Sequence, residues 1–279
     1  MMWTIREAAA SFSVTRMSKL IRDIYEYREL LLVMVFRNIK IRYKGSVLGF
    51  FWSLLSPVFL ILIYAVFLHI MQVRGFSLSA LITGIIVWQF LALCLGDSLY
   101  AVLGNANLVK KTAFPRIVLP LSMVIANTVN FVLSLLVLGV YLAFAGAHCG
   151  NVLWLPLIIL THFALCLGVS LIFATANVFF RDTEHSLQIV TMAWFFLTPV
   201  IYPISFPLGI LQERLPAIGR WLLFANPMVG IVSAYRDVLL STERMPLRWL
   251  AVSFVVAWCV CLAGLALFQK AQTRFADEL

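Results

Sequence analysis

Charged residues are scarce in this sequence. Asp, Glu, Lys and Arg make up only 12% of its 279 residues, whereas about 25% is typical of a soluble domain. Hydrophobic residues make up 63%, and so large an excess of apolar side chains must face lipid. A bilayer-spanning helix needs about 20 mostly apolar residues, and several runs are this long. We therefore expect one all-α polytopic membrane domain with little soluble mass beside it.

Several functional motifs are also missing. No glycine precedes a lysine, so the chain lacks the G-x-x-x-x-G-K-[ST] loop that holds nucleotide phosphates. H-E-x-x-H is absent, and the five cysteines show no spacing typical of a disulfide framework or a metal site. We predict a transport subunit that moves but does not hydrolyse ATP itself and is powered by another protein. It is expected to have no catalytic residue, metal or cofactor of its own. No signal peptide is expected, because a charged segment precedes the first apolar run.

Six apolar runs predict six membrane-spanning helices. They cover approximately residues 48–71, 78–103, 117–144, 152–179, 187–201 and 247–268. Between the last two runs, prolines divide residues 203–240 into apolar fragments too short to cross a bilayer. Such fragments are typical of re-entrant or interfacial helices, and we place a pore entrance or exit there. Residues 48–268 thus form the predicted permease domain, between an N-terminal segment (1–47) and a short tail (269–279).

The distribution of basic residues predicts the orientation. Fifteen of the 21 Lys and Arg residues fall in the two termini, the 104–117 loop and the turn at Arg181 and Asp182, and six fall on the opposite side. By the positive-inside rule, the termini, this loop and this turn lie in the cytoplasm. The net charge of +9 is explained by this bias and by attraction to anionic lipids. We expect contact with membrane lipids and no nucleic-acid binding.

An amphipathic helix is predicted for residues 22–44. Leu31, Val35 and Ile39 form an apolar row, and polar residues occupy a stripe on the opposite side. The stripe consists of Arg22, Glu26, Glu29, Arg37, Lys40 and Lys44. Such a helix lies in the membrane interface, either as a general anchor or as a gate whose cations meet phosphate groups. The candidate gate cations are Arg37, Lys40, Arg42 and Lys44.

Asp97 is the only carboxylate within the apolar runs. A charge inside a bilayer is costly and needs a partner. Asn127 and Asn130, on the next run, lie at a similar distance from the 104–117 loop and share one helical face. We therefore predict that both asparagines hydrogen-bond Asp97, as a contact between helices rather than as a catalytic group.

Aromatic residues in the first two runs have two interpretations. Trp52 and Phe59 are seven residues apart and share a helical face, and Trp88 lies near the middle of the second run. An aromatic belt with ordinary packing is one explanation. A channel wall that stacks on sugar rings is the other.

The loop between the second and third runs combines cations with apolar residues. Lys110, Lys111 and Arg116 surround Val109 and Phe114, which we expect to be exposed. A loop that only joins two membrane helices needs no exposed apolar side chains. We therefore predict that this loop grips another protein on the cytoplasmic side.

Several short motifs occur in order around the six predicted spans. They are residues 37–52 (RNIKIRYKGSVLGFFW), 54–57, 105–116 (NANLVKKTAFPR), 177–182, 198–202, 226–227, 235–237 and 274–276. Each is weak alone, but together they extend over nearly the whole chain. In this order, the chain resembles the permease subunits of polysaccharide ABC exporters of the O-antigen and teichoic-acid type, a branch of the type-2 ABC exporters.

The resemblance implies a homodimeric channel in the bacterial inner membrane, with two copies of a separate cytoplasmic ATPase that binds ATP and Mg. The 104–117 loop would contain the coupling helix, residues 22–44 the gate helix and residues 203–240 the re-entrant helices at the exit. The substrate would be a glycan on an undecaprenyl-pyrophosphate carrier, received by the gate cations. The implied ATPase-coupling residues are Asn105, Val109, Lys110, Lys111, Phe114, Pro115, Arg116, Arg181 and Asp182.

Two alternatives stay open. One is a type-2 ABC exporter of a drug or lipid, whose neighbouring genes would not encode glycosyltransferases. The other is a membrane enzyme of lipid-linked glycan synthesis, for which Asp182, Glu184 and His185 form the only tight acid–base cluster. A charged turn at the start of a helix is ordinary, which favours transport over catalysis.

Overall fold

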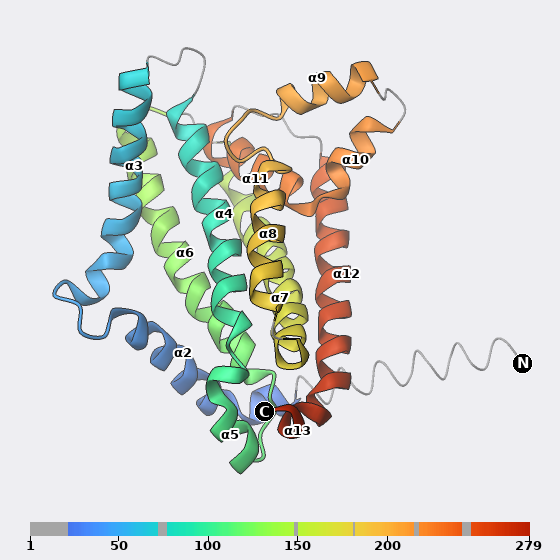
Figure 1. Ribbon diagram of the computed structural model, residues 1–279. Coiled ribbons are helices and arrows are strands. Elements are labelled where there is room, and N and C mark those ends of the chain that lie inside the picture. Colours follow the sequence, from blue (N-terminus) through green and yellow to red (C-terminus); the bar gives the residue numbers. More distant parts are fainter. Residues whose placement is uncertain (1–21, 72–76, 148–149, 181, 215–217, 242–246) are drawn as a thin grey trace, which may run out of the picture.

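The computed structural model describes residues 22–71, 77–147, 150–180, 182–214, 218–241 and 247–279, and over these residues the chain is helical, with no strand (Figure 1). The α-helices are α2 (Arg28–Tyr43), α3 (Trp52–Met71), α4 (Leu78–Leu99), α5 (Ala106–Lys111), α6 (Val118–Phe144), α7 (Leu155–Phe179), α8 (Thr183–Phe196), α9 (Ser205–Arg214), α10 (Gly219–Ala225), α11 (Pro227–Leu240), α12 (Leu247–Ala271) and α13 (Phe275–Glu278). The 3-10 helices are η1 (Gly49–Phe51), η2 (Leu103–Asn105), η3 (Val152–Trp154) and η4 (Gln272–Arg274). The all-α prediction is confirmed for this part of the chain.

Five helical segments are long and apolar enough to cross a membrane. They cover Gly49–Phe67, Leu78–Leu99, Val118–Phe144, Val152–Phe179 and Trp249–Glu278. Five of the six predicted runs are thus found, with shifted ends. The helix of the second run, α4, ends at Leu99 rather than at residue 103. The helix of the last run, α12, continues to Ala271 rather than stopping at residue 268. The ends shift because an apolar run reports composition, whereas backbone hydrogen bonding decides where a helix stops.

The fifth predicted run, residues 187–201, corresponds to the shorter helix α8. It has 14 residues, or about 21 Å at 1.5 Å per residue, against about 30 Å for the hydrocarbon core of a bilayer. It begins at Thr183 because the polar residues after Asp182 form its first turn. It ends at Phe196, ahead of Pro199, whose ring disfavours helical geometry in the preceding residue. A sixth full-length span is therefore not found among the described residues.

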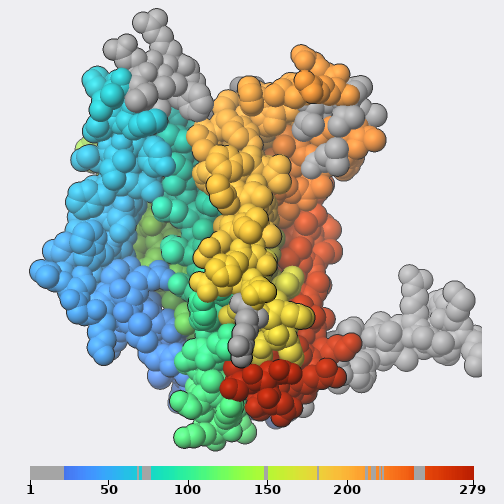
Figure 2. Space-filling view, in the orientation of Figure 1, coloured from blue at the N-terminus to red at the C-terminus, as the bar shows by residue number. Residues whose placement is uncertain are grey.

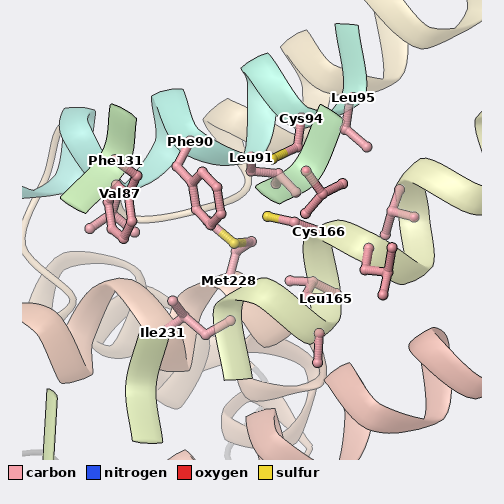
Figure 3. Packing of buried hydrophobic residues seen from close by; sticks show 14 of the residues in the cluster. Val87, Phe90, Leu91, Cys94, Leu95, Phe131, Leu165, Cys166, Met228 and Ile231 are labelled. Carbon is pink, nitrogen blue, oxygen red and sulfur yellow. The ribbon is translucent and has the colours of Figure 1, made fainter. Parts of the chain in front are cut away.

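The core lies where α4, α6, α7 and α11 pack together. Phe90 of α4 stacks on Phe131 of α6 with ring centroids 4.6 Å apart. Cys94, Cys166 and Met228 belong to the same buried cluster (Figure 3). Nearly every residue of α11 is buried, so this helix is an internal element of the bundle rather than a surface fragment.

The most extensive pairing is between α7 and α12, and two glycines permit it. A Cβ atom on Gly168 would lie 2.6 Å from the Cα of Cys261, and one on Gly264 would lie 2.3 Å from the carbonyl oxygen of Gly168. Small residues let helix backbones approach closely in membranes. These two positions therefore determine how near α12 comes to α7.

The two ends of the bundle carry different short helices (Figure 1). The helices α9 and α10 lie across one end, and α11 leads back from them into the bundle. All three fall within the predicted 203–240 region. At the opposite end, α5 and α13 lie side by side (Figure 2). We call this second end the α5 end.

Candidate functional site

The predicted coupling segment, residues 104–117, forms the short helix α5 with the turn η2 before it and an extended return after it. Asn105, the residue before α5, is bonded on both sides. Its Nδ2 donates to the carbonyl oxygen of Ala101 at 2.8 Å, and its Oδ1 accepts from Nη2 of Arg37 at 2.8 Å. Asn105 therefore joins α5 to the end of α4 and to α2.

The expected exposure of the two apolar residues in this segment is wrong for Val109. Its side chain is only 3% exposed, and Phe114 is half-buried against the same core. The helix α5 packs its apolar face on the protein because a six-residue helix is marginal without tertiary contacts. Its outward surface is formed instead by Asn107, Lys110 and Lys111.

The C-terminal tail supports this segment, which the sequence did not indicate. Phe275 of α13 is fully buried, with its ring centroid 6.0 Å from that of Phe179 and 5.3 Å from that of Phe268. Arg116 donates a hydrogen bond from Nη1 to the carbonyl oxygen of Gln272. The expected role of Arg116 as a docking cation stays untested; its guanidinium joins the loop to the tail. Pro115 beside it is half-buried.

The charged turn before α8 is described in part. Arg181 lies outside the described residues, whereas Asp182 is exposed and precedes the first residue of α8. Glu184 accepts a hydrogen bond from the hydroxyl of Tyr100, which raises the pKa of Tyr100 above its usual value. The link joins the start of α8 to the residue that follows α4.

The predicted helix 22–44 is found in two parts: residues 22–26 are helical, a turn at Tyr27 follows, and α2 continues to Tyr43. Val35 of the expected apolar row is buried, and its neighbours Leu31 and Ile39 are half-buried. Of the candidate gate cations, Lys40, Arg42 and Lys44 are exposed and Arg37 is half-buried. Arg37 and Arg42 bond residues of other elements. The helix packs mainly on α6 (Figure 1).

The predicted partner of Asp97 is confirmed for one asparagine and wrong for the other. Asn127 donates from Nδ2 to Oδ2 of Asp97 at 2.8 Å. Asn130 accepts from the hydroxyl of Tyr43 at 3.3 Å instead. Arg42 forms an ion pair with Asp97 and also donates to Oδ1 of Asn127 at 2.6 Å. The intramembrane carboxylate is therefore paired with a cation from α2, a partner that helical spacing within the apolar runs did not reveal.

The three candidate channel aromatics are not equivalent. Trp52 and Phe59 lie on one face of α3, with ring centroids 6.4 Å apart, and both are exposed beside a shallow hollow that Ser56 and Tyr64 also line. Trp88 is only 6% exposed, because it packs edge-on against Trp194 and Phe195 of α8. Within the described chain, Trp88 thus serves packing between α4 and α8.

The sequence analysis did not predict that Arg236 is buried and links several elements. Its guanidinium is buried and donates to the carbonyl oxygens of Ala80, Val200 and Tyr202 at 3.1, 2.8 and 3.2 Å. Gly84 leaves room for it, since a Cβ there would lie 2.9 Å from Nη2. Arg236 therefore ties α11 to the start of α4 and to the turn after α8. Its position inside the 235–237 motif was the available signal.

Comparison with known proteins identifies the family. Residues 29–240 match the model of the ABC-2 type transporter family. Two O-antigen export system permease proteins RfbA from Klebsiella pneumoniae are each 31% identical over 256 residues, which is 90% of this chain and 95% of theirs. The protein of the same name from Myxococcus xanthus is 32% identical over 274 residues, 94% of this chain and 100% of its own length. The chain therefore belongs to the ABC-2 type transporter family, as a multi-pass membrane permease.

Proposed function

We propose that the chain forms the channel of an ATP-driven exporter that moves an undecaprenyl-pyrophosphate-linked, O-antigen-like polysaccharide out of the cytoplasm across the inner membrane. The names of its relatives, which are O-antigen export permeases, support the substrate class. The absence of a nucleotide-binding loop from the sequence supports a transport subunit whose ATP and Mg are bound by a separate ATPase.

The observation that carries the proposal is the construction of the α5 end. A helix of six residues is unstable by itself, yet α5 is held by the Arg37–Asn105 bond, by the burial of Val109 and by the Arg116–Gln272 bond. Its outward face carries the exposed cations Lys110 and Lys111. A cationic helix that is fixed to the bundle in this way can transmit movement from a protein bound to it. We assign this partner as a cytoplasmic ABC ATPase, present in two copies on a permease homodimer. Both chain termini are then cytoplasmic, on the same side as the α5 end.

The remaining parts fit a glycan substrate. Exposed Lys40 and Lys44 lie just ahead of α3, where a pyrophosphate group arriving from the cytoplasmic side meets them first. Exposed Trp52 and Phe59 provide aromatic faces on α3 that suit sugar rings. The helices α9 and α10 stand at the opposite end, where we place the exit.

A deletion strain tests the substrate class. We expect finished undecaprenyl-linked polymer to accumulate on the cytoplasmic leaflet, as measured by extracting the lipid-linked glycans and probing each leaflet separately. A strain complemented with the intact gene is the control. Normal surface polymer in the deletion strain would favour the second candidate, an exporter of a drug or lipid. Loss of the polymer itself would point to synthesis instead, for which the turn at Asp182 offers little, since Glu184 is already bonded to Tyr100.

A further inference from the structure

Arg42, Asp97 and Asn127 form a polar cluster between three helices. Arg42 lies one residue before the end of α2, Asp97 two residues before the end of α4, and Asn127 within α6. Arg42 pairs with Asp97 and donates to Asn127 at 2.6 Å, while Asn127 donates to the same Asp97 oxygen at 2.8 Å. The three side chains thus satisfy one another.

The negative charge of the Asp97 carboxylate is not required for the hydrogen bond to Asn127. Asp97 is the only acidic residue of α3, α4, α6, α7 and α12. An asparagine at this position would keep the bond to Asn127 without placing a charge at membrane depth, where charges are costly. The negative charge therefore has one evident use, which is to neutralise the guanidinium of Arg42.

The cluster is open to a ligand. The side chains of Arg42 and Asp97 remain 28% and 34% exposed, so an incoming anion can reach the guanidinium. The chain after α2 is also suited to movement of that helix. Gly45 and Gly49 adopt φ of +78° and +53°, and a Cβ atom at either would meet no atom within 4 Å; small residues at the ends of helices are often the hinges of such movements.

We propose that Asp97 is an internal competitor for the anionic ligand of Arg42: the carboxylate holds the guanidinium while the site is empty, and a phosphate group of the lipid-linked substrate displaces it. This inference rests on the proposed function. Guanidinium groups bind carboxylates and phosphates through the same paired donors. A phosphate group that approaches Arg42 also comes close to the Asp97 carboxylate, and the repulsion between the two anions favours separation of α2 from Asp97.

The separation reaches the α5 end through the same helix. Arg37, five residues before Arg42, holds Asn105 at the start of α5. A ligand that draws Arg42 away from Asp97 also shifts Arg37, and with it the helix on which the partner ATPase is proposed to act. The cluster thereby makes substrate binding and α5 position interdependent.

The test measures binding of undecaprenyl diphosphate to the permease–ATPase complex in phosphatidylcholine nanodiscs by native mass spectrometry. We expect D97N to bind it roughly tenfold more tightly, a difference of about 1.4 kcal/mol, because the ligand no longer has to displace a carboxylate from Arg42. R42Q is expected to bind about tenfold more weakly, and D97N/R42Q to match R42Q. The control is T128A on α6, the helix of Asn127, because the Thr128 hydroxyl donates to the carbonyl oxygen of Val124 within that helix; its affinity should equal that of the wild type.

A second measurement keeps Arg42 and Asp97 intact. Asn38 of α2 donates to Ser122 of α6 at 3.0 Å, so cysteines at these two positions, joined by a short thiol cross-linker, hold α2 against α6. We expect the cross-linked complex to bind undecaprenyl diphosphate about tenfold more weakly than the same variant without the linker. This result decides the question if D97N fails to assemble.

The possible outcomes separate the inference from the proposed function. Wild-type binding with equal or weaker binding by folded D97N overturns the role of Asp97 and leaves the proposed substrate in place. Absence of binding by every variant overturns both. Phosphatidylglycerol, added in a parallel arm, should not compete with undecaprenyl diphosphate; if it competes equally, the ligand is an ordinary lipid headgroup and the assignment to substrate is wrong.

Discussion

Replacing Phe275 with alanine tests how the α5 end is held together. The ring is fully buried between Phe179 of α7 and Phe268 of α12. It is the side chain that anchors α13 to the bundle, and α13 in turn packs against α5. Removing the ring should therefore release the tail and loosen α5 while leaving the helical bundle folded.

The magnitude follows from the burial. A Phe→Ala change at a fully buried site costs about 3–5 kcal/mol. Gln272, whose carbonyl oxygen accepts from Arg116, belongs to the same tail, so that bond is weakened with it. Because about 1.4 kcal/mol corresponds to a factor of ten, local opening of residues 272–279 should become at least about a hundredfold more frequent.

Hydrogen exchange followed by mass spectrometry measures this opening on the purified permease. Peptides covering residues 272–279 and 105–116 should exchange faster in F275A, and peptides from α6 should keep their wild-type rates. The control is R274A, since Arg274 is exposed on the adjacent turn. Unchanged exchange in the tail would refute the anchoring role. Equal acceleration in α6 would show that Phe275 supports the whole bundle instead.

Two other substitutions test the packing and the partner surface. G168A places a Cβ 2.6 Å from the backbone of α12, so we expect a loss of about 1–3 kcal/mol, seen as a lower Tm. G139A, whose Cβ would meet nothing within 4 Å, should leave the Tm equal or higher, because alanine is the better helix former. Replacing exposed Lys110 and Lys111 with glutamate should abolish co-purification with the ATPase at unchanged Tm, whereas R214E at the opposite end should not; normal co-purification of the double variant would remove α5 from the docking surface.

Composition and spacing predicted much of the fold. Runs of apolar residues located five membrane-length helices, because lipid imposes the same requirement on every span whatever it packs against. The polar pair of Asp97 and Asn127 was also predictable, since a membrane charge needs a partner at equal depth. The bounds of the short helix α8 were predicted less well. Its start is set by the polar turn at Asp182 and its end by Pro199, and neither follows from the hydropathy pattern.

Other features depended on the tertiary structure alone. Helical spacing cannot show that Arg42 approaches Asp97, because the two residues are 55 positions apart and belong to different helices. The same holds for Phe275 and Val109, whose burial is decided by the tail folding back beside α5. Sequence thus determined which segments are long and apolar enough to cross a membrane and which family the chain resembles, since both depend on local residue type and order. Only the packing of α2, α5 and α13 on the bundle decided that Arg37, Arg42 and Arg116 bond other elements while Lys110 and Lys111 are exposed, because long-range contacts, not local patterns, select the partners of a charged group.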